Sequence, residues 1–508
     1  MSASDAARRA GLTVWGVALI SGALALNRDL VGVFYDDGIY ASLGWALGHG
    51  IGYVHPHLPG APAAVHFPPL YPLVLAPLFG TVSVQTAAFA GKVLNVILAA
   101  IAAGLIAWHA TRSELLGAGT PRWLPGVVVG AAAIAIPVLT VLTTLLSEPL
   151  FALLLALAVI LADRPPERLA PTHAALLAGL AAALALLARS IGVAAGAGVV
   201  GFLLFVRRVG RAAAGYAALP VAVAAVAWAA WVLRHAHIID PALRADYGTY
   251  GDVLTQSGLS ALGASTLDLP RPLGVLTLGW VIAFGDYYRY LYYLFGIPAL
   301  AVGVYGLRLL LSRSAIGPTL AGYLAILAVW PVPPDRFLWA VLPWIALAWV
   351  AGAVALWRQQ RLRVAVALLA LALGLGYARY EARGFAGRWW SLAAHQISAN
   401  MDELLPWIET LPSSAVLATD DESLIWLYTR RTAVPLYLFS YRGREEAPIS
   451  PAAQLAFLER TGVTHVLVTG PGPGAAELDA LVRAAPSRFR LVRRWPGGRA
   501  AFEVTRES

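Results

Sequence analysis

Long apolar runs alternate with short polar segments over the first 380 residues of the chain. As helices, these runs are long enough to cross a hydrocarbon core of about 30 Å. The pattern therefore predicts a polytopic α-helical membrane protein with about eleven membrane-spanning helices. They are expected over Leu12–Leu26, Val84–His109, Val127–Leu146, Ser147–Ala162, Thr172–Ala188, Val193–Val206, Ala212–Leu233, Tyr290–Leu311, Ala315–Trp330, Phe337–Trp357 and Val364–Tyr380.

Two connections are much longer than the others, and both are predicted to lie on the external side. The first, residues 27–83, contains Ile39–Leu47, which has helical spacing, and Leu70–Phe79, which is too short to span. We expect both to lie along the interface or in a protein-lined cavity, since lipid cannot satisfy irregular backbone. The second connection is residues 234–289. Its middle, Pro272–Phe284, is apolar enough to lie on or in the membrane.

The pattern becomes that of a soluble domain from Glu381 onward. The chain is thus predicted to consist of a membrane domain, residues 1–380, and a small external α/β domain, residues 381–508. Gly470–Gly474 lacks the G-x-G-x-x-G spacing, and its prolines have no N–H donors, so it is predicted to be a loop and not a nucleotide site. The predicted strands are Ala415–Asp420, Thr464–Thr469, Phe489–Trp495 and Ala500–Val504, and the predicted helices are Asn400–Thr410 and Pro451–Thr461.

Composition and charge support this interpretation, because 59% of the residues are hydrophobic and only 13% are charged. The absence of cysteine excludes disulfides and thiolate metal sites. The formal charge of +9 is spread over short loops, which argues against nucleic-acid binding. The positive-inside rule, with Arg8 and Arg9 before the first span, places the N-terminus in the cytoplasm and the C-terminal domain outside the inner (plasma) membrane. No small-residue cleavage site follows the first span, so we expect an uncleaved helix.

Several charged side chains are predicted to gather at one level, the outer ends of the spans. Acids are costly near lipid, so the adjacent Asp36 and Asp37, which follow the first span, are the first candidates for chemistry. Lys92, the only lysine, lies about two turns into its span, where an ammonium needs an anion or a wet cavity. The other members of this set are His66, Glu148, Arg189 and Arg336.

Each of these residues also has a simple structural interpretation. The two aspartates would then be solvated loop acids, and Lys92 would extend to the lipid headgroups. Glu148 would stabilise the N-terminus of its helix through the helix dipole. In the same way, Arg189 would be a turn residue, Arg336 would pair with Asp335, and His66 would be a packed loop histidine.

The charged set suits a reaction in which a hydroxyl attacks and an anionic phosphate leaves. A carboxylate would act as the base. A guanidinium and an ammonium would stabilise the charge of the departing phosphate, which needs no general acid. Direct attack at the anomeric carbon of a sugar would invert its configuration.

Six short segments, in this order, resemble the GT-C glycosyltransferases of the protein O-mannosyltransferase and aminoarabinose-transferase kind. The resemblance covers residues 12–380. It implies an enzyme that takes a sugar from a polyprenyl-phosphate carrier on the outer membrane face and uses an acid of the first loop as base. The segments are Asp36–Tyr40, Gly50–Tyr53, His66–Pro72, Ser147–Phe151, Leu187–Gly192 and Asp335–Leu338 with Pro343.

The resemblance also implies roles for individual residues. Asp36 matches the catalytic base, and Asp37 stands where the family usually has Glu. Arg189 and Arg336 match cations near the carrier phosphate. The donor would be a polyprenyl-phosphate sugar, and the acceptor a lipid, glycan or protein. The remaining substrate-binding candidates are Tyr40, His66, Tyr71, Lys92 and Glu148.

Two other functions fit parts of the sequence. A lipid-linked glycan flippase also needs a charged cavity, but transporters usually show an internal repeat, and the sequence shows no convincing one. A non-catalytic scaffold would explain the external domain but not the charged set. The sequence leaves open the donor sugar, the acceptor, the oligomeric state and a divalent metal ion as cofactor.

Overall fold

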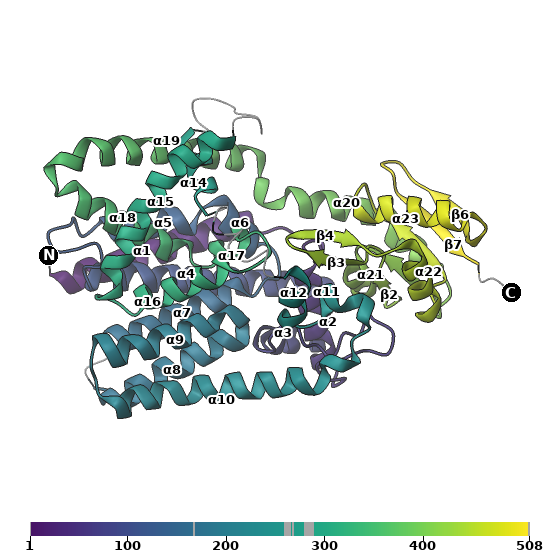
Figure 1. Cartoon of the computed structure of the whole chain (residues 1–508), viewed down its shortest axis with the longest axis horizontal. Coiled ribbons are helices and arrows are strands. Elements are labelled where there is room, and N and C mark those ends of the chain that lie inside the picture. The colour runs from purple at the N-terminus through teal and green to yellow at the C-terminus, as the bar shows by residue number, and fades with distance from the viewer. Residues whose placement is uncertain (1, 166–167, 259–265, 267–268, 279–288, 506–508) are drawn as a thin grey trace.

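The computed structural model describes residues 2–165, 168–258, 266, 269–278 and 289–505. Figure 1 shows a large helical part that contains the N-terminus and a smaller α/β part that contains the C-terminus. Helix α20 (Leu392–Glu409) leads from one part to the other. The predicted fold class, a polytopic helical membrane protein with a small C-terminal α/β region, is confirmed.

Each predicted span coincides with one helix or with a pair of helices. Two spans are broken: α5 (Leu124–Ala133) meets α6 (Ile136–Leu142) at 58°, and α17 (Asp335–Trp339) precedes α18 (Leu342–Trp357). A proline near the start of α6 and of α18 has no N–H with which to continue the preceding helix. The other helices are α1 (Ala3–Ala25), α4 (Val84–Arg112), α7 (Glu148–Asp163), α8 (Pro171–Ala188), α9 (Val193–Gly201) with η2 (Phe202–Val206), α10 (Arg211–His235), α15 (Arg289–Leu311), α16 (Ile316–Ala328) and α19 (Arg363–Gly387).

The chain is a multi-pass membrane protein, but the predicted count of about eleven spans is not confirmed. Among the described residues, five helices are long and apolar enough to cross a membrane, and the bent α5–α6 pair would make a sixth. Several of the other apolar helices are shorter than these; α16 has 13 residues and α18 has 16. The five are Val84–Arg112, Pro171–Ala188, Arg211–Ile238, Tyr290–Leu311 and Gln360–Gly387.

The first long connection folds into two short helices that pack against each other, α2 (Asp36–Gly48) and α3 (Leu70–Thr81). Both aspartates therefore lie in the first turn of α2, where the helix dipole favours negative charge. The second connection contains η3 (Ala236–Ile238), η4 (Pro241–Leu243), α11 (Arg244–Tyr247), α12 (Tyr250–Ser257) and α14 (Arg271–Leu278). Helix α14 covers the first half of the apolar stretch Pro272–Phe284, and residues 279–284 lie outside the described part of the chain.

The C-terminal α/β region (α20 to β7) contains a five-stranded sheet of order β2-β1-β5-β7-β6. Strand β1 is parallel to β2 and β5, whereas β7 is antiparallel to β5 and β6. The four predicted strands and two predicted helices are confirmed, with shifted ends for the first helix. The confirmed elements are β1 (Val416–Thr419), β5 (His465–Val468), β6 (Phe489–Arg494), β7 (Ala500–Val504), α20 and α22 (Pro451–Arg460).

Sequence reasoning missed five elements of this region. The strands among them lack the apolar runs that marked β1 and β5, because β3 and β4 contain charged residues and β2 and β4 end in proline. The loop prediction for Gly470–Gly474 is wrong for its last two residues, because Pro473 and Gly474 form the first turn of α23. Proline is tolerated there since its missing N–H is not needed. The missed elements are α21 (Glu422–Thr429), β2 (Thr432–Pro435), β3 (Phe439–Arg442), β4 (Glu445–Pro448) and α23 (Pro473–Ala484).

The C-terminal α/β region packs directly on the segment that carries Asp36. Helix α21 contacts α2, and the N–H of Val31 donates to the hydroxyl of Tyr428 at 3.1 Å. Gly38, two residues after Asp36, has to be small because a Cβ atom there would overlap the hydroxyl of Ser423. The α/β region is thus part of the support for the first turn of α2.

Candidate active site

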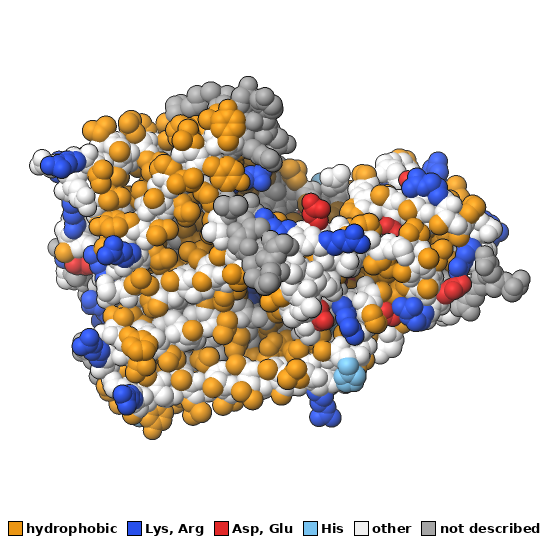
Figure 2. All heavy atoms as spheres, viewed as in Figure 1, with side chains coloured by type: hydrophobic (Ala, Val, Ile, Leu, Met, Phe, Trp, Pro, Cys, Tyr) orange, Lys and Arg blue, Asp and Glu red, His pale blue; other side chains and the backbone are white. Residues whose placement is uncertain are grey.

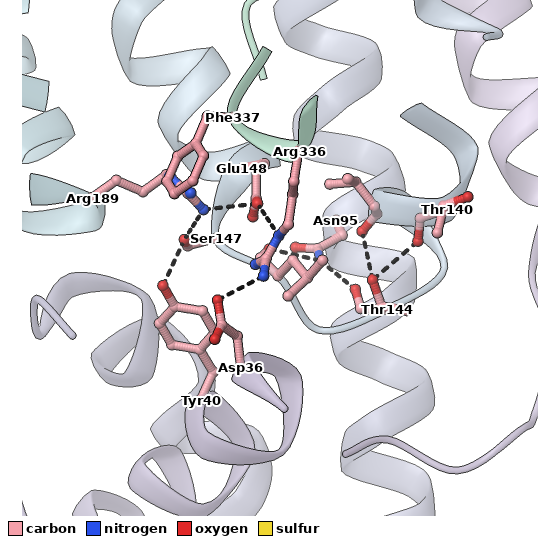
Figure 3. Close-up of polar contacts among 12 residues, drawn as sticks. Asp36, Tyr40, Asn95, Thr140, Thr144, Ser147, Glu148, Arg189, Arg336 and Phe337 are labelled. Carbon is pink, nitrogen blue, oxygen red and sulfur yellow. Dashed lines mark hydrogen bonds and ion pairs between the residues drawn. The ribbon is translucent and has the colours of Figure 1, made fainter. Parts of the chain in front are cut away.

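Glu148 lies at the centre of a buried group of charges (Figure 3). It is the first residue of α7, and its side chain is 1% exposed. Its Oε1 is 2.8 Å from Nη1 of Arg189 and 2.9 Å from Nε of Arg336. A buried carboxylate requires partners of this kind because an unpaired buried charge is very unfavourable. One carboxylate therefore fixes two guanidinium groups next to each other.

Asp36 joins this group through Arg336, as Figure 3 shows. Its Oδ2 lies 2.7 Å from Nη1 of Arg336. The side chains of Asp36 and Arg336 are 25% and 28% exposed, whereas that of Arg189 is only 9% exposed. The group of charges therefore opens to the exterior at the Asp36–Arg336 pair.

Two uncharged side chains, those of Phe337 and Ser147, contact the guanidinium of Arg189. Its backbone is extended where α8 ends and η1 (Ser190–Gly192) begins, and its guanidinium carbon lies 5.4 Å from the ring centre of Phe337. Its Nη1 also donates to Oγ of Ser147 at 3.3 Å, and that Oγ lies 2.9 Å from the hydroxyl of Tyr40. Side chains from α2, α7, α17 and the α8–η1 junction thus meet at one place (Figure 3).

These contacts differ from the simple structural interpretations of the same residues. Arg336 pairs with Asp36 and Glu148 and not with its neighbour Asp335. Glu148 does lie at a helix N-terminus, but its carboxylate is engaged in ion pairs. Arg189 does more than form a turn, because it holds that carboxylate.

Asp37, although adjacent to Asp36, faces a different environment. Its side chain is buried, and its two oxygens accept hydrogen bonds from the N–H groups of Gly32 and Phe34, each at 2.8 Å. These contacts close the backbone turn that precedes α2. The two aspartates therefore have different partners although they are adjacent in the sequence.

Lys92 is not brought together with the two arginines. Its Nζ donates to Oδ1 of Asn27 at 2.8 Å and to the backbone oxygen of Asp29 at 2.7 Å. Both partners follow the end of α1. The structure thus places Lys92 apart from Arg189 and Arg336.

His66 and Tyr71 lie at the edge of the site. Nδ1 of His66 is 2.9 Å from the backbone oxygen of Gly248, and its ring packs 4.5 Å from that of Tyr250. Burial lowers the pKa of His66, so the ring is neutral near pH 7 and donates from Nδ1. The hydroxyl of Tyr71 donates to Oδ1 of Asn95 at 3.0 Å, and its ring packs edge-on against Tyr40.

A second buried polar network, which sequence reasoning missed, links the C-terminal α/β region to both long connections. The hydroxyl of Tyr247 donates to Oε1 of Glu422 at 2.5 Å, and Nε2 of His57 lies 3.0 Å from that hydroxyl. Tyr247 directly precedes Gly248, the partner of His66. No local signal could have paired Tyr247 with Glu422, because 175 residues separate them.

The Glu422→Gln variant is expected to make stability less dependent on pH. Burial raises the pKa of Glu422 well above its ordinary value of 4.5. The folded protein therefore holds a proton that the unfolded chain releases, so the Glu422 contribution to the free energy of unfolding is greatest below about pH 4.5 and falls as pH rises. Thermal unfolding of the two proteins at several pH values measures the difference. Parallel curves for both would contradict this prediction.

The described residues contain no group of three or more His, Asp or Glu side chains arranged to hold a metal ion. Asp36, the partly exposed carboxylate of the Glu148 group, already forms an ion pair with Arg336. The carboxylate oxygens of this site therefore do not form the ligand set that a bound divalent metal ion needs.

Comparison with known proteins identifies the fold. No protein-family model and no curated protein matches the sequence. Among solved structures, the archaeal oligosaccharyltransferase AglB from Archaeoglobus fulgidus, in complex with an inhibitory peptide and a dolichol-phosphate, is similar with a TM-score of 0.50 and 11% identity. The match covers 95% of this chain and 72% of that one. The same oligosaccharyltransferase in complex with Zn and sulfate is similar with a TM-score of 0.50 and 14% identity over 96% and 72% of the two chains.

ArnT from Cupriavidus metallidurans, bound to undecaprenyl phosphate, is 16% identical over 97% of each chain, with a TM-score of 0.45. The similarity to the oligosaccharyltransferase extends over nearly the whole of the present chain, including its C-terminal region. The chain has the fold of the GT-C membrane glycosyltransferases.

Proposed function

We propose that the protein is a membrane glycosyltransferase that transfers a sugar from a polyprenyl-phosphate donor to a lipid, glycan or protein acceptor on the external face. The observation that carries the proposal is the arrangement around Arg336. This arginine contacts the accessible carboxylate of Asp36 on one side and the buried Glu148 on the other. A base and a fixed cation are therefore adjacent at the opening of the site.

In this mechanism Asp36 takes the proton of the acceptor hydroxyl. The hydroxyl oxygen forms a bond to the anomeric carbon while the bond from that carbon to the phosphate oxygen breaks. The phosphate leaves with the electron pair, and the configuration at the carbon is inverted. Carboxylates serve as the base in inverting glycoside chemistry of this kind.

Arg336 and Arg189 stabilise the charge that the phosphate gains. Nη2 of Arg336 is buried and has no hydrogen-bond partner among the described residues, so it is free to donate to a phosphate oxygen. Glu148 holds both guanidinium groups in place before the ligand arrives. Donors fixed in advance lower the barrier because they need no reorganisation during the reaction.

The same proposal assigns residues 1–380 to a catalytic membrane domain and residues 381–508 to an external domain on the inner (plasma) membrane. Figure 2 supports this orientation, since the basic side chains that are visible on the helical part lie mostly at its end farthest from the α/β region. Basic residues favour the cytoplasmic side of a membrane. Dolichol-phosphate in the AglB complex supports a polyprenyl-phosphate donor.

Reporter fusions at Gly119 and Ser508 test the orientation. We expect the Gly119 fusion to report the cytoplasm and the Ser508 fusion the external side, because the short loops between spans are rich in arginine. A fusion at Arg168, in another of these loops, serves as an internal control. Detection of Gly119 and Ser508 on the same side would contradict the proposed topology.

The function itself is tested by incubating the purified protein with a polyprenyl-phosphate sugar and membrane extract. Lipid extracts from cells that lack the protein identify which polyprenyl-phosphate sugar accumulates and therefore which donor to use. We expect labelled sugar to move to an acceptor with release of the free carrier phosphate. Movement of the intact lipid-linked sugar across a vesicle membrane without any transfer would instead indicate a flippase.

A further inference from the structure

A cavity of about 260 Å³ lies between the end of α1, the start of α4 and the C-terminal α/β region. It is distinct from the Glu148 group, because none of the charged residues of that group lines it. Lys92 is on its wall and is 1% exposed. The residues that line the cavity and matter for its chemistry are Asn27, Arg28, Asp29, Gln85, Lys92 and Tyr428.

The ammonium of Lys92 has hydrogen bonds but no direct counter-ion. Its two partners, Oδ1 of Asn27 and the backbone oxygen of Asp29, are neutral acceptors. No carboxylate of the described residues lies within ion-pair distance of Nζ. The carboxylates of Asp37 and Asp29 attract the ammonium, but only from beyond ion-pair distance. A buried ammonium in this state is costly unless a closer anion compensates it. The third N–H of the ammonium also has no protein partner among the described residues.

Other groups around the cavity favour an anion as well. Nδ2 of Asn27 is a buried donor without a partner among the described residues. Arg28 adds a second positive charge, with its guanidinium 5.1 Å from the ring centre of Phe89. The carboxylate of Asp29 opposes an anion, but one of its oxygens lies 3.4 Å from Nδ1 of His395. The charged residues that line the cavity, Arg28, Asp29 and Lys92, therefore leave one positive charge, which the carboxylate of Asp37 opposes without direct contact. The cavity also has unused N–H donors.

The position of the cavity indicates where the anion comes from. It lies at the end of α1 and the start of α4, and α4 is long and apolar enough to cross a membrane. Lipid headgroups lie at the ends of such helices. Leu24, three residues before Asn27, is 81% exposed, and Ile20 one turn earlier is 62% exposed. A lipid whose phosphate enters the cavity would find apolar surface for its chains along α1.

We propose that this cavity is a second phosphate-binding site, separate from Arg189 and Arg336, which takes the phosphate group of a lipid headgroup. Lys92 and Asn27 provide the N–H donors. The site would anchor the α1–α4 edge, and through Tyr428 the α/β region, to the headgroup layer. This inference does not depend on the proposed glycosyl transfer.

The Asn27→Asp variant is the sharpest test. Aspartate keeps the acceptor for Lys92, supplies the missing counter-ion and removes the free Nδ2 donor, so the fold should be retained. We expect phosphatidylglycerol to bind at least about tenfold more weakly, as expected for loss of a hydrogen bond to a charged group. Native mass spectrometry of the purified protein in a neutral detergent measures this binding. Lys92→Met, a second variant, should weaken binding by a similar factor.

The same measurement on Arg336→Ala, which weakens the proposed donor site, separates the two sites: phosphatidylglycerol binding that is lost in Asn27→Asp and Lys92→Met should be retained in Arg336→Ala. Diacylglycerol with the same chains controls for apolar contacts and should not be retained. Inorganic phosphate should displace phosphatidylglycerol, which would support recognition of the phosphate itself. Unchanged phosphatidylglycerol binding by both variants, or equal retention of diacylglycerol, would overturn the proposal. Binding of inorganic phosphate without binding of the lipid would overturn the lipid assignment.

Discussion

Asp36→Asn is expected to lower the rate of sugar transfer by about 10²–10⁴-fold, the range associated with the loss of a positioned base. Asparagine keeps the shape of the side chain but cannot accept the proton of the acceptor hydroxyl. Binding of the polyprenyl-phosphate donor should be retained, because Glu148 still holds Arg336 and Arg189. The measurement is single-turnover transfer with enzyme in excess over bound donor, which separates the chemical step from donor binding and product release.

Asp37→Asn is the matched control for this variant, since it makes the same chemical change one residue away. Asp37 accepts hydrogen bonds from the N–H groups of Gly32 and Phe34, and an amide cannot accept both. We therefore expect its main effect on stability, with a smaller loss of transfer than for Asp36→Asn. Near-normal transfer by Asp36→Asn would eliminate the proposed base. A defect confined to Asp37→Asn would move the base to that residue.

Arg336→Lys is expected to lower transfer by about 10²–10³-fold, as found when a preorganised donor to a developing negative charge is removed. The guanidinium reaches Asp36 with Nη1 and Glu148 with Nε, and it has Nη2 left for a phosphate oxygen. One ammonium cannot make these three contacts in the geometry of a planar fork. Initial rates at limiting and at saturating donor separate weaker donor binding from a slower chemical step.

Arg460→Lys is the matched control, because it makes the same chemical change in an exposed ion pair, with Asp240, that is not part of the Glu148 group. Exposed pairs of this kind contribute little to stability, so this variant should transfer at the normal rate. Arg189→Lys should resemble Arg336→Lys, with a smaller effect on donor binding because Arg189 is more deeply buried. Full turnover by Arg336→Lys at limiting donor would show that the phosphate is held elsewhere.

The sequence by itself determined the features that depend on local pattern. Apolar runs marked the helices of the predicted spans, because a long apolar segment can bury its side chains away from water only as a helix when it lies in a membrane. Short runs rich in aliphatic and aromatic residues marked β1, β5, β6 and β7. The charged residues also stood out individually, since charges are rare within apolar surroundings.

Only the tertiary structure decided which of these charges meet. Asp36, Glu148 and Arg336 come from distant segments, and their contact depends on how α2, α7 and α17 pack. The orientations of Asp36 and Asp37 differ because consecutive residues of a helical turn point in directions about 100° apart. Lys92 was separated from the arginines because the end of α1 provided nearer acceptors. Local pattern fixes whether a segment is a helix, whereas long-range packing determines which side chains share a site, and no short stretch of sequence contains that information.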